Sequence, residues 1–218
     1  MKTKSNFIVM ALSTVVCLLP LILSFMVYND LPEEVVIQLN VKGNPNRYLP
    51  KAAAAFGLPL FFAAVNIISK IFLYNDPKRE NISKAARIIA EWIVPLFALA
   101  LVPVILFMAM GSQIPLPIIA LVFTGIVLIL CGNYLPKSRQ NYVIGIKLPW
   151  TLNNTDNWNR THRMAGYLYM CCGIVLIIAS FLFFGKSILL ILILSILALM
   201  IIAPVLYSYS LYKRNGSD

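Results

Sequence analysis

Few side chains in this chain could carry out chemistry, and they are scattered. The sequence has one histidine, His162, and the only carboxylate near it in the chain is Asp156. A general base or metal ligand needs a positioned partner, and no second histidine is present. No Ser-His-Asp order, glycine-rich phosphate loop or H-E-x-x-H motif occurs, and the adjacent pair Cys171-Cys172 matches neither a redox nor a zinc motif. The pattern disfavours an enzyme and predicts no catalytic residue, cofactor or metal.

Glu91 is the second candidate, because it is the one acidic residue within an apolar run. An intramembrane carboxylate indicates function by default, such as an ion or proton pathway. Glu91 also follows Arg87 by four residues, one turn inside the run, and this spacing suits a structural ion pair at the interface. The sequence leaves the two interpretations open.

A polar stretch from Gly132 to Tyr169 separates two long apolar runs and contains the histidine. It also contains Trp150 and Trp158, two of the three tryptophans. Long loops are usually functional or disordered, and this one has too many aromatic residues for a disordered segment. We therefore expect the specific function of the protein to depend on this polar loop.

Local signals predict the structure of the polar loop. Pro136 should end the preceding helix, and residues 142–152 have the composition of an interfacial or re-entrant segment. Asn154 or Thr155 should cap a new helix that runs directly into the next span. On that helix Trp158 and His162 are four residues apart and share one face.

Two interpretations of these aromatic residues remain. Trp150, Trp158 and His162 could form a cytoplasmic docking or ligand surface. Alternatively, they could anchor the loop at the lipid headgroups, where tryptophan and tyrosine are enriched. The residues alone slightly favour the anchoring interpretation.

Composition places the chain in a membrane. Of its 218 residues 60% are hydrophobic and 12% are charged, and its mean hydropathy is +0.83. Apolar runs of this length are typical of membrane spans. The first run is longer than a signal-peptide core and lacks a cleavage site, which favours an uncleaved span. The sequence predicts an all-α, six-span protein with spans near 7–28, 52–74, 88–110, 114–131, 164–184 and 188–212.

The distribution of basic residues predicts the orientation. If both termini are cytoplasmic, fourteen basic residues lie inside and four lie outside, which agrees with the positive-inside rule. The polar loop then faces the cytoplasm and the 29–51 loop faces out. Lys70, near the end of the second span, is expected to snorkel to the interface. The net charge of +10 is explained by this placement, and no basic stripe indicates direct nucleic-acid binding.

The outer loop has its own pattern. Residues 35–41 have strand composition, and Gly43-Asn44-Pro45-Asn46 is a strong turn signal. The sequence predicts a short extended segment, a turn and a proline-led entry into the next span.

Two stretches resemble a known family. The polar loop resembles the signature of the SdpI family of bacterial membrane proteins, and the outer loop is similar to the small DUF1648 domain often found ahead of it. In the polar loop the matching positions are Gly132, Asn133, Pro136, Asn141, Gly145, Ile146, Pro149, Trp150, Thr151, Leu152, Trp158, Thr161, His162, Arg163 and Gly166. In the outer loop they are Leu31, Pro32, Asn40, Gly43, Pro45 and Lys51. Lys147 and Leu148 depart from the family pattern, which often has Arg-Thr there.

The resemblance implies a non-enzymatic immunity protein of the bacterial plasma membrane. Such a protein protects the producing cell from a secreted peptide toxin, and the founding type also draws a soluble transcriptional repressor to the membrane. The implied partners are therefore toxin, repressor and membrane lipid. The predicted segments are 1–74 with the outer loop, 75–131 with spans three and four, and 132–218 with the signature loop and spans five and six. The alternatives are a small transporter or channel that uses Glu91, and a membrane enzyme that uses His162.

Overall fold

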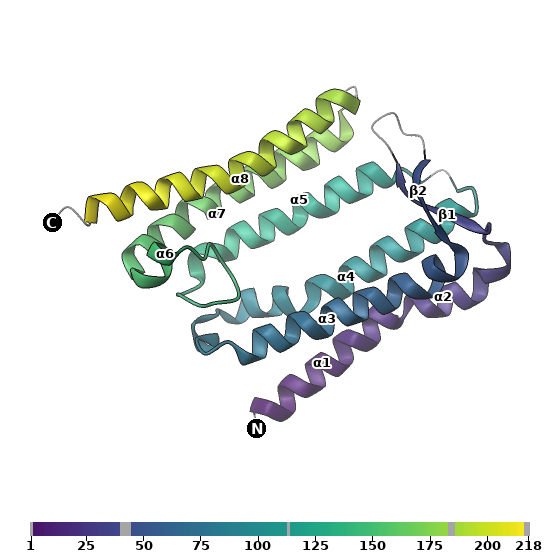
Figure 1. Ribbon diagram of the computed structural model, residues 1–218, viewed down its shortest axis with the longest axis horizontal. Coiled ribbons are helices and arrows are strands. Elements are labelled where there is room, and N and C mark those ends of the chain that lie inside the picture. Colours follow the sequence, from purple (N-terminus) through teal and green to yellow (C-terminus); the bar gives the residue numbers. More distant parts are fainter. Residues whose placement is uncertain (1, 40–44, 113, 183–185, 216–218) are drawn as a thin grey trace. The chain divides into compact units, whose positions relative to one another are not determined.

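The computed structural model describes residues 2–39, 45–112, 114–182 and 186–215 (Figure 1). The protein is mostly helical, and the predicted number of spans is confirmed among the described residues. Which side of the membrane the termini face stays a prediction. The helices long and apolar enough to span are Lys4–Asp30, Ala53–Asn75, Lys84–Ala109, Pro117–Lys137, Thr155–Phe181 and Ser187–Arg214.

The chain folds as two compact units. The first unit comprises Met1–Tyr74 and Ala90–Leu116, and the second comprises Asn75–Ile89 and Pro117–Asp218. Most of the third span therefore packs with the first two spans, whereas the connector before it folds with the polar loop. The boundaries of the two units differ from those of the predicted segments 75–131 and 132–218, because each unit combines stretches that are not consecutive in the chain.

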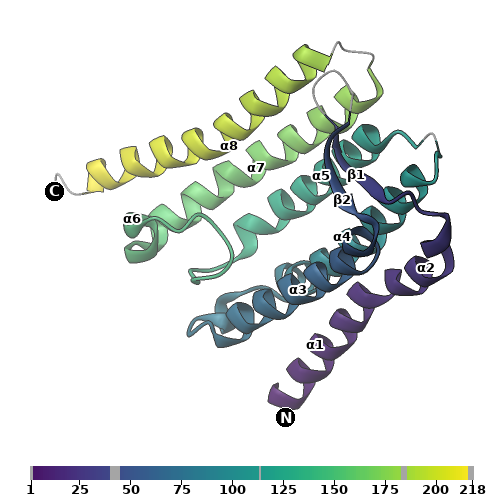
Figure 2. The same cartoon turned by 45° about the vertical axis from the view of Figure 1, so that its right-hand side comes forward.

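The first span is broken by a proline. Helix α1 (Lys2–Leu18) and helix α2 (Pro20–Val27) are separate because Pro20 has no N–H to continue the hydrogen-bond ladder, and the chain bends there (Figure 2). A 3-10 turn, η1 (Tyr28–Asp30), ends the span.

The outer loop, residues 29–51, contains two short strands. Strand β1 (Glu34–Leu39) pairs antiparallel with β2 (Pro45–Pro50), and the register shifts after Val36 as in a β-bulge. The predicted strand is confirmed as β1, whereas the second strand β2, which begins within the predicted turn Gly43–Asn46, was not predicted. Asn40 and Gly43 lie outside the described residues.

Contacts at the base of the hairpin fix it to the first unit. Val35 is fully buried. Lys51 Nζ donates to Glu33 Oε1 at 2.8 Å and lies 5.2 Å from the ring centroid of Tyr28. The hydrogen bond to Glu33 raises the pKa of the Lys51 ammonium above its ordinary 10.5. Pro32 and Pro45 are exposed.

Helices α3 (Leu58–Asn75) and α4 (Lys84–Ala109) complete the first unit. A π-helical turn, η2 (Ala53–Gly57), precedes α3, and its small residues allow close packing. The core beside it is formed by Leu31, Ala55, Val102 and Leu106.

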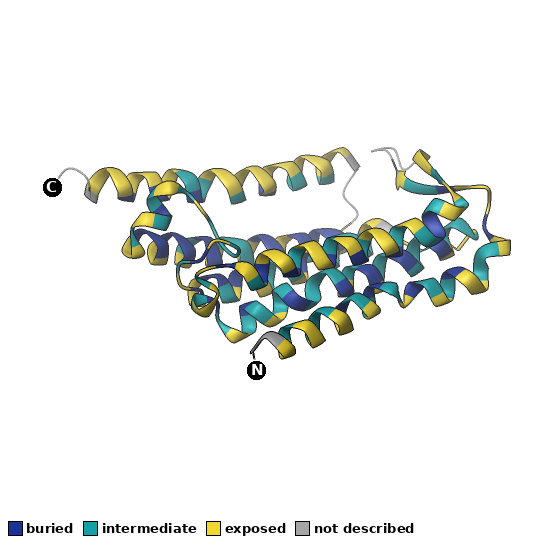
Figure 3. Ribbon diagram, turned by 60° about the horizontal axis from the view of Figure 1, so that its bottom comes forward, coloured by how far each residue is buried: buried dark blue, intermediate teal, exposed yellow. Residues whose placement is uncertain are grey.

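Three helices make up the second unit: α5 (Leu116–Tyr134), α7 (Thr155–Phe181) and α8 (Lys186–Asn215). The smaller elements are η3 (Arg79–Asn81), η4 (Leu135–Lys137) and α6 (Pro149–Asn153). Most of α8 is exposed along its length (Figure 3). Its exposed side chains are largely apolar, as expected for a helix that faces lipid.

Glycines let α5 and α7 approach backbone to backbone. A Cβ on Gly125 would lie 2.7 Å from the Gly173 carbonyl oxygen, and one on Gly132 would lie 2.6 Å from that of Gly166. Real Cβ atoms do not approach this closely, so both crossings require glycine. The pairs lie one heptad apart on antiparallel helices, a spacing that keeps both on the contact face.

Candidate functional site

The polar loop between α5 and α7 is folded around the side chain of Asn141. This amide is fully buried. Its Nδ2 donates to the Arg139 carbonyl at 2.9 Å and to Ser138 Oγ at 3.2 Å. Its Oδ1 accepts the backbone N–H groups of Val143 and Ile144 at 3.0 and 2.6 Å. Because both donors and the acceptor of the amide are used, Asn141 fixes the turn that reverses the loop.

The connector before α4 contributes a carboxylate to the loop, and sequence reasoning missed it. Asp76 is almost fully buried. Its Oδ2 accepts the backbone N–H of Tyr142 at 2.9 Å, and its Oδ1 accepts that of Lys78 at 2.7 Å. The turn signal Asn75-Asp76-Pro77 indicates local structure, but nothing in chain order connects Asp76 to a loop more than sixty residues later.

Asn81 ties the same two segments together. Its Nδ2 donates to the Gln140 carbonyl at 2.7 Å, and its own carbonyl accepts the N–H of Arg139 at 3.1 Å. Gln140 Nε2 then donates to the carbonyl of Thr151 at 2.9 Å. Residues 75–83, which precede α4, are thus part of the site.

Trp158 and His162 form a buried stacked pair at the start of α7. Their ring centroids are 3.8 Å apart with an interplanar angle of 21°. Both side chains are 0% exposed. Trp158 Nε1 donates to the carbonyl of Ser138 at 2.9 Å. The predicted shared face of this helix is confirmed, and so is its start, since Asn154 Oδ1 caps it by accepting the N–H of Asn157 at 2.9 Å.

Both nitrogens of His162 are engaged. Nδ1 lies 2.7 Å from the carbonyl oxygen of Trp158, which can only accept, so Nδ1 carries the proton. Nε2 lies 2.9 Å from the backbone nitrogen of Ile146, which can only donate, so Nε2 is unprotonated. The imidazole is therefore neutral and holds the loop backbone against α7.

Gly145 lies directly against the stacked rings of Trp158 and His162. Its φ is +123°, a conformation that residues with a side chain rarely adopt. A Cβ there would collide with His162 Nε2 and would lie 3.0 Å from the Trp158 ring. Two independent constraints thus require glycine.

Thr151 stabilises the start of the short helix α6. Its Oγ1 donates to the carbonyl of Ile146 at 2.8 Å and accepts the N–H of Leu148 at 2.9 Å. Pro149 occupies the first turn of α6, where no N–H is needed. The residues predicted as an interfacial or re-entrant segment therefore include one turn of helix, and their depth in the membrane stays a prediction.

Two oxygen atoms of Ser208 in α8, its hydroxyl and its carbonyl, accept hydrogen bonds from Trp150 and Asn157. Trp150 Nε1 donates to Ser208 Oγ, and Asn157 Nδ2 donates to the Ser208 carbonyl, both at 2.9 Å. Thr161 Oγ1 supports Asn157 by donating to its Oδ1 at 3.0 Å. The loop is thereby attached to the last span.

The remaining signature residues lie at the edge of the loop. Asn133, Pro136 and Arg163 are exposed. Asn133 Oδ1 accepts from Lys137 Nζ at 3.3 Å. Pro136 packs against Gly166, where a Cβ would lie 2.7 Å from Pro136 Cγ.

The hypothesis of an exposed docking surface around Trp150, Trp158 and His162 does not match this burial. Trp158 and His162 have no surface for a partner or for lipid headgroups, and Trp150 is half-buried. The physical reason is that the loop needs hydrogen-bond partners for its backbone, and these side chains supply them.

In the first unit, Lys70 does not snorkel. It is fully buried, and its ammonium donates to Asn66 Oδ1 at 2.9 Å and to the Glu91 carbonyl at 2.5 Å. Pro95 has no N–H, so the Glu91 carbonyl lacks its usual partner in α4. Lys70 supplies the missing donor, which explains why its side chain turns inward.

Asn66 extends this contact to α1. Its Nδ2 donates to Ser13 Oγ at 2.9 Å and to Thr14 Oγ1 at 3.0 Å. The polar network formed by Ser13, Thr14, Asn66 and Lys70 therefore joins α1, α3 and α4.

Glu91 lies beside this network. Its side chain is 6% exposed, and Oε1 accepts from the hydroxyl of Tyr74 at 3.1 Å. A part for Glu91 in an ion pathway stays a prediction.

The buried polar side chains of the described residues are bonded within the protein. Throughout the described ranges, every buried side-chain nitrogen or oxygen has a hydrogen-bond partner. The same residues contain no group of three or more His, Cys, Asp or Glu side chains that could hold a metal ion. Through these hydrogen bonds the buried side chains hold backbone segments and helices in place.

Comparisons with known proteins agree with both family resemblances. Residues 137–208 match the SdpI/YfhL protein family, and residues 15–63 match a domain of unknown function, DUF1648. The chain is 30% identical over 213 residues to the Immunity protein SdpI of Bacillus subtilis (strain 168), covering 94% of this chain and 97% of that protein. No solved structure matches.

Proposed function

This chain belongs to the SdpI/YfhL protein family, and from that membership we propose that it is an integral membrane immunity protein. It would protect its own cell from a secreted antimicrobial peptide or toxin. The observation that carries the proposal is the similarity to an immunity protein over nearly the full length of both chains, which includes the polar loop and the outer hairpin.

The saturated hydrogen bonding of the polar loop supports a non-enzymatic mechanism. A general base needs a nitrogen or oxygen that can reach a substrate, and both His162 nitrogens are already bonded inside the protein. Recognition of toxin would then occur in the spans or at the outer hairpin, while the loop keeps α7 and α8 in place.

The basic residues at one end of the second unit support the proposal that the termini are cytoplasmic. The chain passes along α5 to the polar loop, leaves along α7 and returns along α8, so the C-terminus and the loop lie at one end of this unit (Figure 1). That end carries the basic residues Lys137, Arg139, Lys147, Arg160, Arg163, Lys213 and Arg214. The positive-inside rule places such an end in the cytoplasm.

A second, signalling role is part of the proposal. A soluble transcriptional repressor would bind the cytoplasmic end of the second unit when toxin is present. The observation that favours it is an exposed, rigidly held surface: Tyr142 is 47% exposed, Lys78 Nζ lies 5.0 Å from its ring centroid, and Asp76 fixes its backbone.

A survival assay tests the immunity proposal. A sensitive bacterium is challenged with a sporulation-delaying-type toxin while it expresses wild-type protein, the Trp150→Ala/Trp158→Ala variant or Glu91→Gln, each at equal membrane levels. Protection by the wild type supports immunity, and absence of protection at several toxin doses contradicts immunity to this toxin class.

The variants separate the mechanisms. Loss of protection in the double variant assigns the polar loop to the mechanism. Loss in Glu91→Gln, with normal membrane levels, favours the transporter alternative, because a proton-coupled carrier needs the ionisable carboxylate. Retained protection in Glu91→Gln favours a packing role, since the amide has nearly the same shape.

A further inference from the structure

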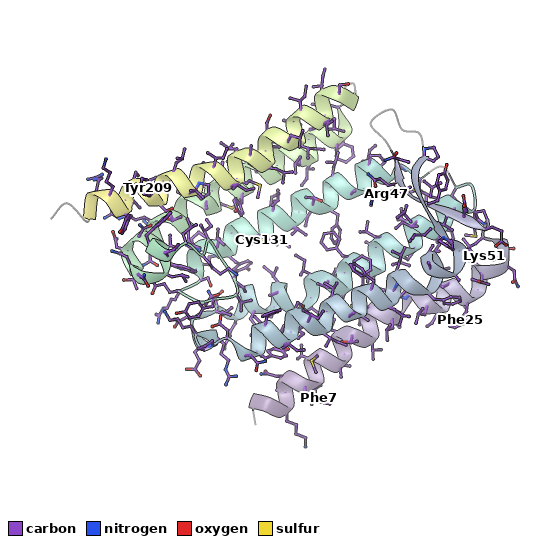
Figure 4. The ribbon with its side chains drawn as sticks, viewed as in Figure 1. Phe7, Phe25, Arg47, Lys51, Cys131 and Tyr209 are labelled. Carbon is purple, nitrogen blue, oxygen red and sulfur yellow. The ribbon has the colours of Figure 1, made fainter. Side chains whose placement is uncertain are left out.

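Three aromatic rings meet where the polar loop contacts α8. The Trp150 ring stacks on Tyr212 with centroids 5.9 Å apart and meets the edge of Tyr209 at 5.6 Å. The two tyrosine rings are 6.4 Å apart. Tyr209 and Tyr212 are 51% and 54% exposed, and Figure 4 shows Tyr209 near the C-terminal end of α8. We call these three residues the ring cluster.

The last span is long enough for the ring cluster beside its C-terminal end to lie at the membrane surface. The apolar helix Ser187–Arg214 has 28 residues, which corresponds to about 42 Å at the usual rise per residue. The hydrocarbon core is about 30 Å thick, so roughly two turns extend beyond it. Tryptophan and tyrosine are the side chains that favour the headgroup depth.

Positive charge follows the rings directly. Lys213 and Arg214 are exposed and occupy the turn after Tyr209 and Tyr212. No acidic residue lies in α8. An aromatic surface at headgroup depth next to two cations complements an anionic phosphate group.

We propose that the ring cluster, together with Lys213 and Arg214, binds the headgroup of an anionic phospholipid of the surrounding bilayer. The rings pack on the glycerol region, and the two cations pair with the phosphate. Trp150 links this site to the polar loop, because its Nε1 donates to Ser208. A bound anionic lipid would then stabilise the contact between the polar loop and α8. This inference does not depend on toxin immunity.

Quenching of tryptophan fluorescence by brominated lipids tests the proposal. The full chain carrying Trp92→Phe is placed in nanodiscs of brominated phosphatidylglycerol or brominated phosphatidylcholine, mixed with unlabelled phosphatidylcholine. In this background the reporter is Trp150, since Trp158 is fully buried. We expect phosphatidylglycerol to quench at a lower mole fraction than phosphatidylcholine.

A pair of charge variants makes the test specific. One basic residue near an anionic surface contributes about a five-fold preference, so Lys213→Gln/Arg214→Gln should lower the preference by ten-fold or more, on the order expected for two charges. Lys137→Gln/Arg139→Gln removes the same charge from the same end of the unit, where Lys137 lies over the ring of Tyr134 and not over the ring cluster, and should retain the preference.

Two results would overturn the proposal. Equal quenching by the two lipids would show no selectivity for an anionic headgroup. An equal loss of preference in both charge variants would assign the effect to the overall basic surface and not to the ring cluster. Correct folding of each variant is checked by a thermal transition like that of the Trp92→Phe background.

Discussion

The two units bury polar side chains for different purposes. In the first unit, Lys70 and Asn66 lie between helices and compensate for a carbonyl that Pro95 deprives of its donor. In the second unit, Asn141 and His162 bind the backbone of a loop that has no regular ladder of its own. Both arrangements answer the same requirement, because an unsatisfied polar group inside a membrane protein costs several kcal/mol.

The two units should therefore differ in the substitutions that they tolerate. The first unit depends on a donor supplied to one carbonyl of α4 that lacks its backbone partner, and a substitute donor could replace it. The second unit depends on shape as well as hydrogen bonds, since the loop backbone lies directly against two stacked rings. We therefore expect the largest effects in the loop and smaller ones in the helix contacts and at the surface.

Gly145→Ala should be the most damaging single change. It forces a side chain into a φ of +123° and against His162, and strain plus overpacking amount to about 3 kcal/mol or more. Gly111→Ala is the matched control in the first unit: its φ is +89°, but no atom lies within 4 Å of the added Cβ, so about 1 kcal/mol is expected. Thermal unfolding in detergent measures both, and equal losses would contradict the contact with His162.

Lys70→Met should cost about 2 kcal/mol, because it leaves the Glu91 carbonyl and Asn66 Oδ1 unsatisfied. Pro95→Ala restores the missing N–H of α4, so in the Lys70→Met background it should regain about 1 kcal/mol. The measurement is a double-mutant cycle on unfolding free energy, with the exposed Lys4→Met as control. Additive effects of the two changes would contradict the inference that Lys70 replaces the N–H that Pro95 lacks.

His162→Phe should cost more than His162→Gln, although phenylalanine keeps the stacking on Trp158. The reason is that phenylalanine leaves the Ile146 N–H and the Trp158 carbonyl unpaired, at about 1 kcal/mol or more each, whereas glutamine offers both a donor and an acceptor. Unfolding transitions measured together with survival on toxin check this order. A loss of protection in His162→Gln without a loss of stability would instead indicate that the imidazole has a chemical role.

Lys51→Gln should have the smallest effect, since its partner Glu33 is largely exposed and solvent screens the pair. The pKa of Lys51 is raised, so its contribution is fully present below the unfolded value of 10.5 and is lost as the pH rises through the folded value. We expect the wild type and Lys51→Gln to unfold alike once the pH is above the folded-state pKa of Lys51. A clear difference that persists there would show that Lys51 acts through packing on Tyr28.

Local pattern explains which features could be predicted. The six spans follow from unbroken apolar runs, the first strand from strand composition before a turn signal, and the start of α7 from the capping preference of Asn154. The i,i+4 spacing of Trp158 and His162 predicted their contact correctly. The inward turn of Lys70 was missed, because snorkelling is the usual behaviour and the demand for a donor arises on another helix.

The sequence by itself determined the six apolar spans and the family. These depend on composition, on periodicity and on residues close together in the chain. Only the tertiary structure decided that Asp76 and Asn81 bind the loop, that Lys70 donates to the Glu91 carbonyl, and that Trp158 and His162 are buried. The physical reason is that a buried polar atom must find a partner wherever the fold provides one, and that partner need not be near in sequence.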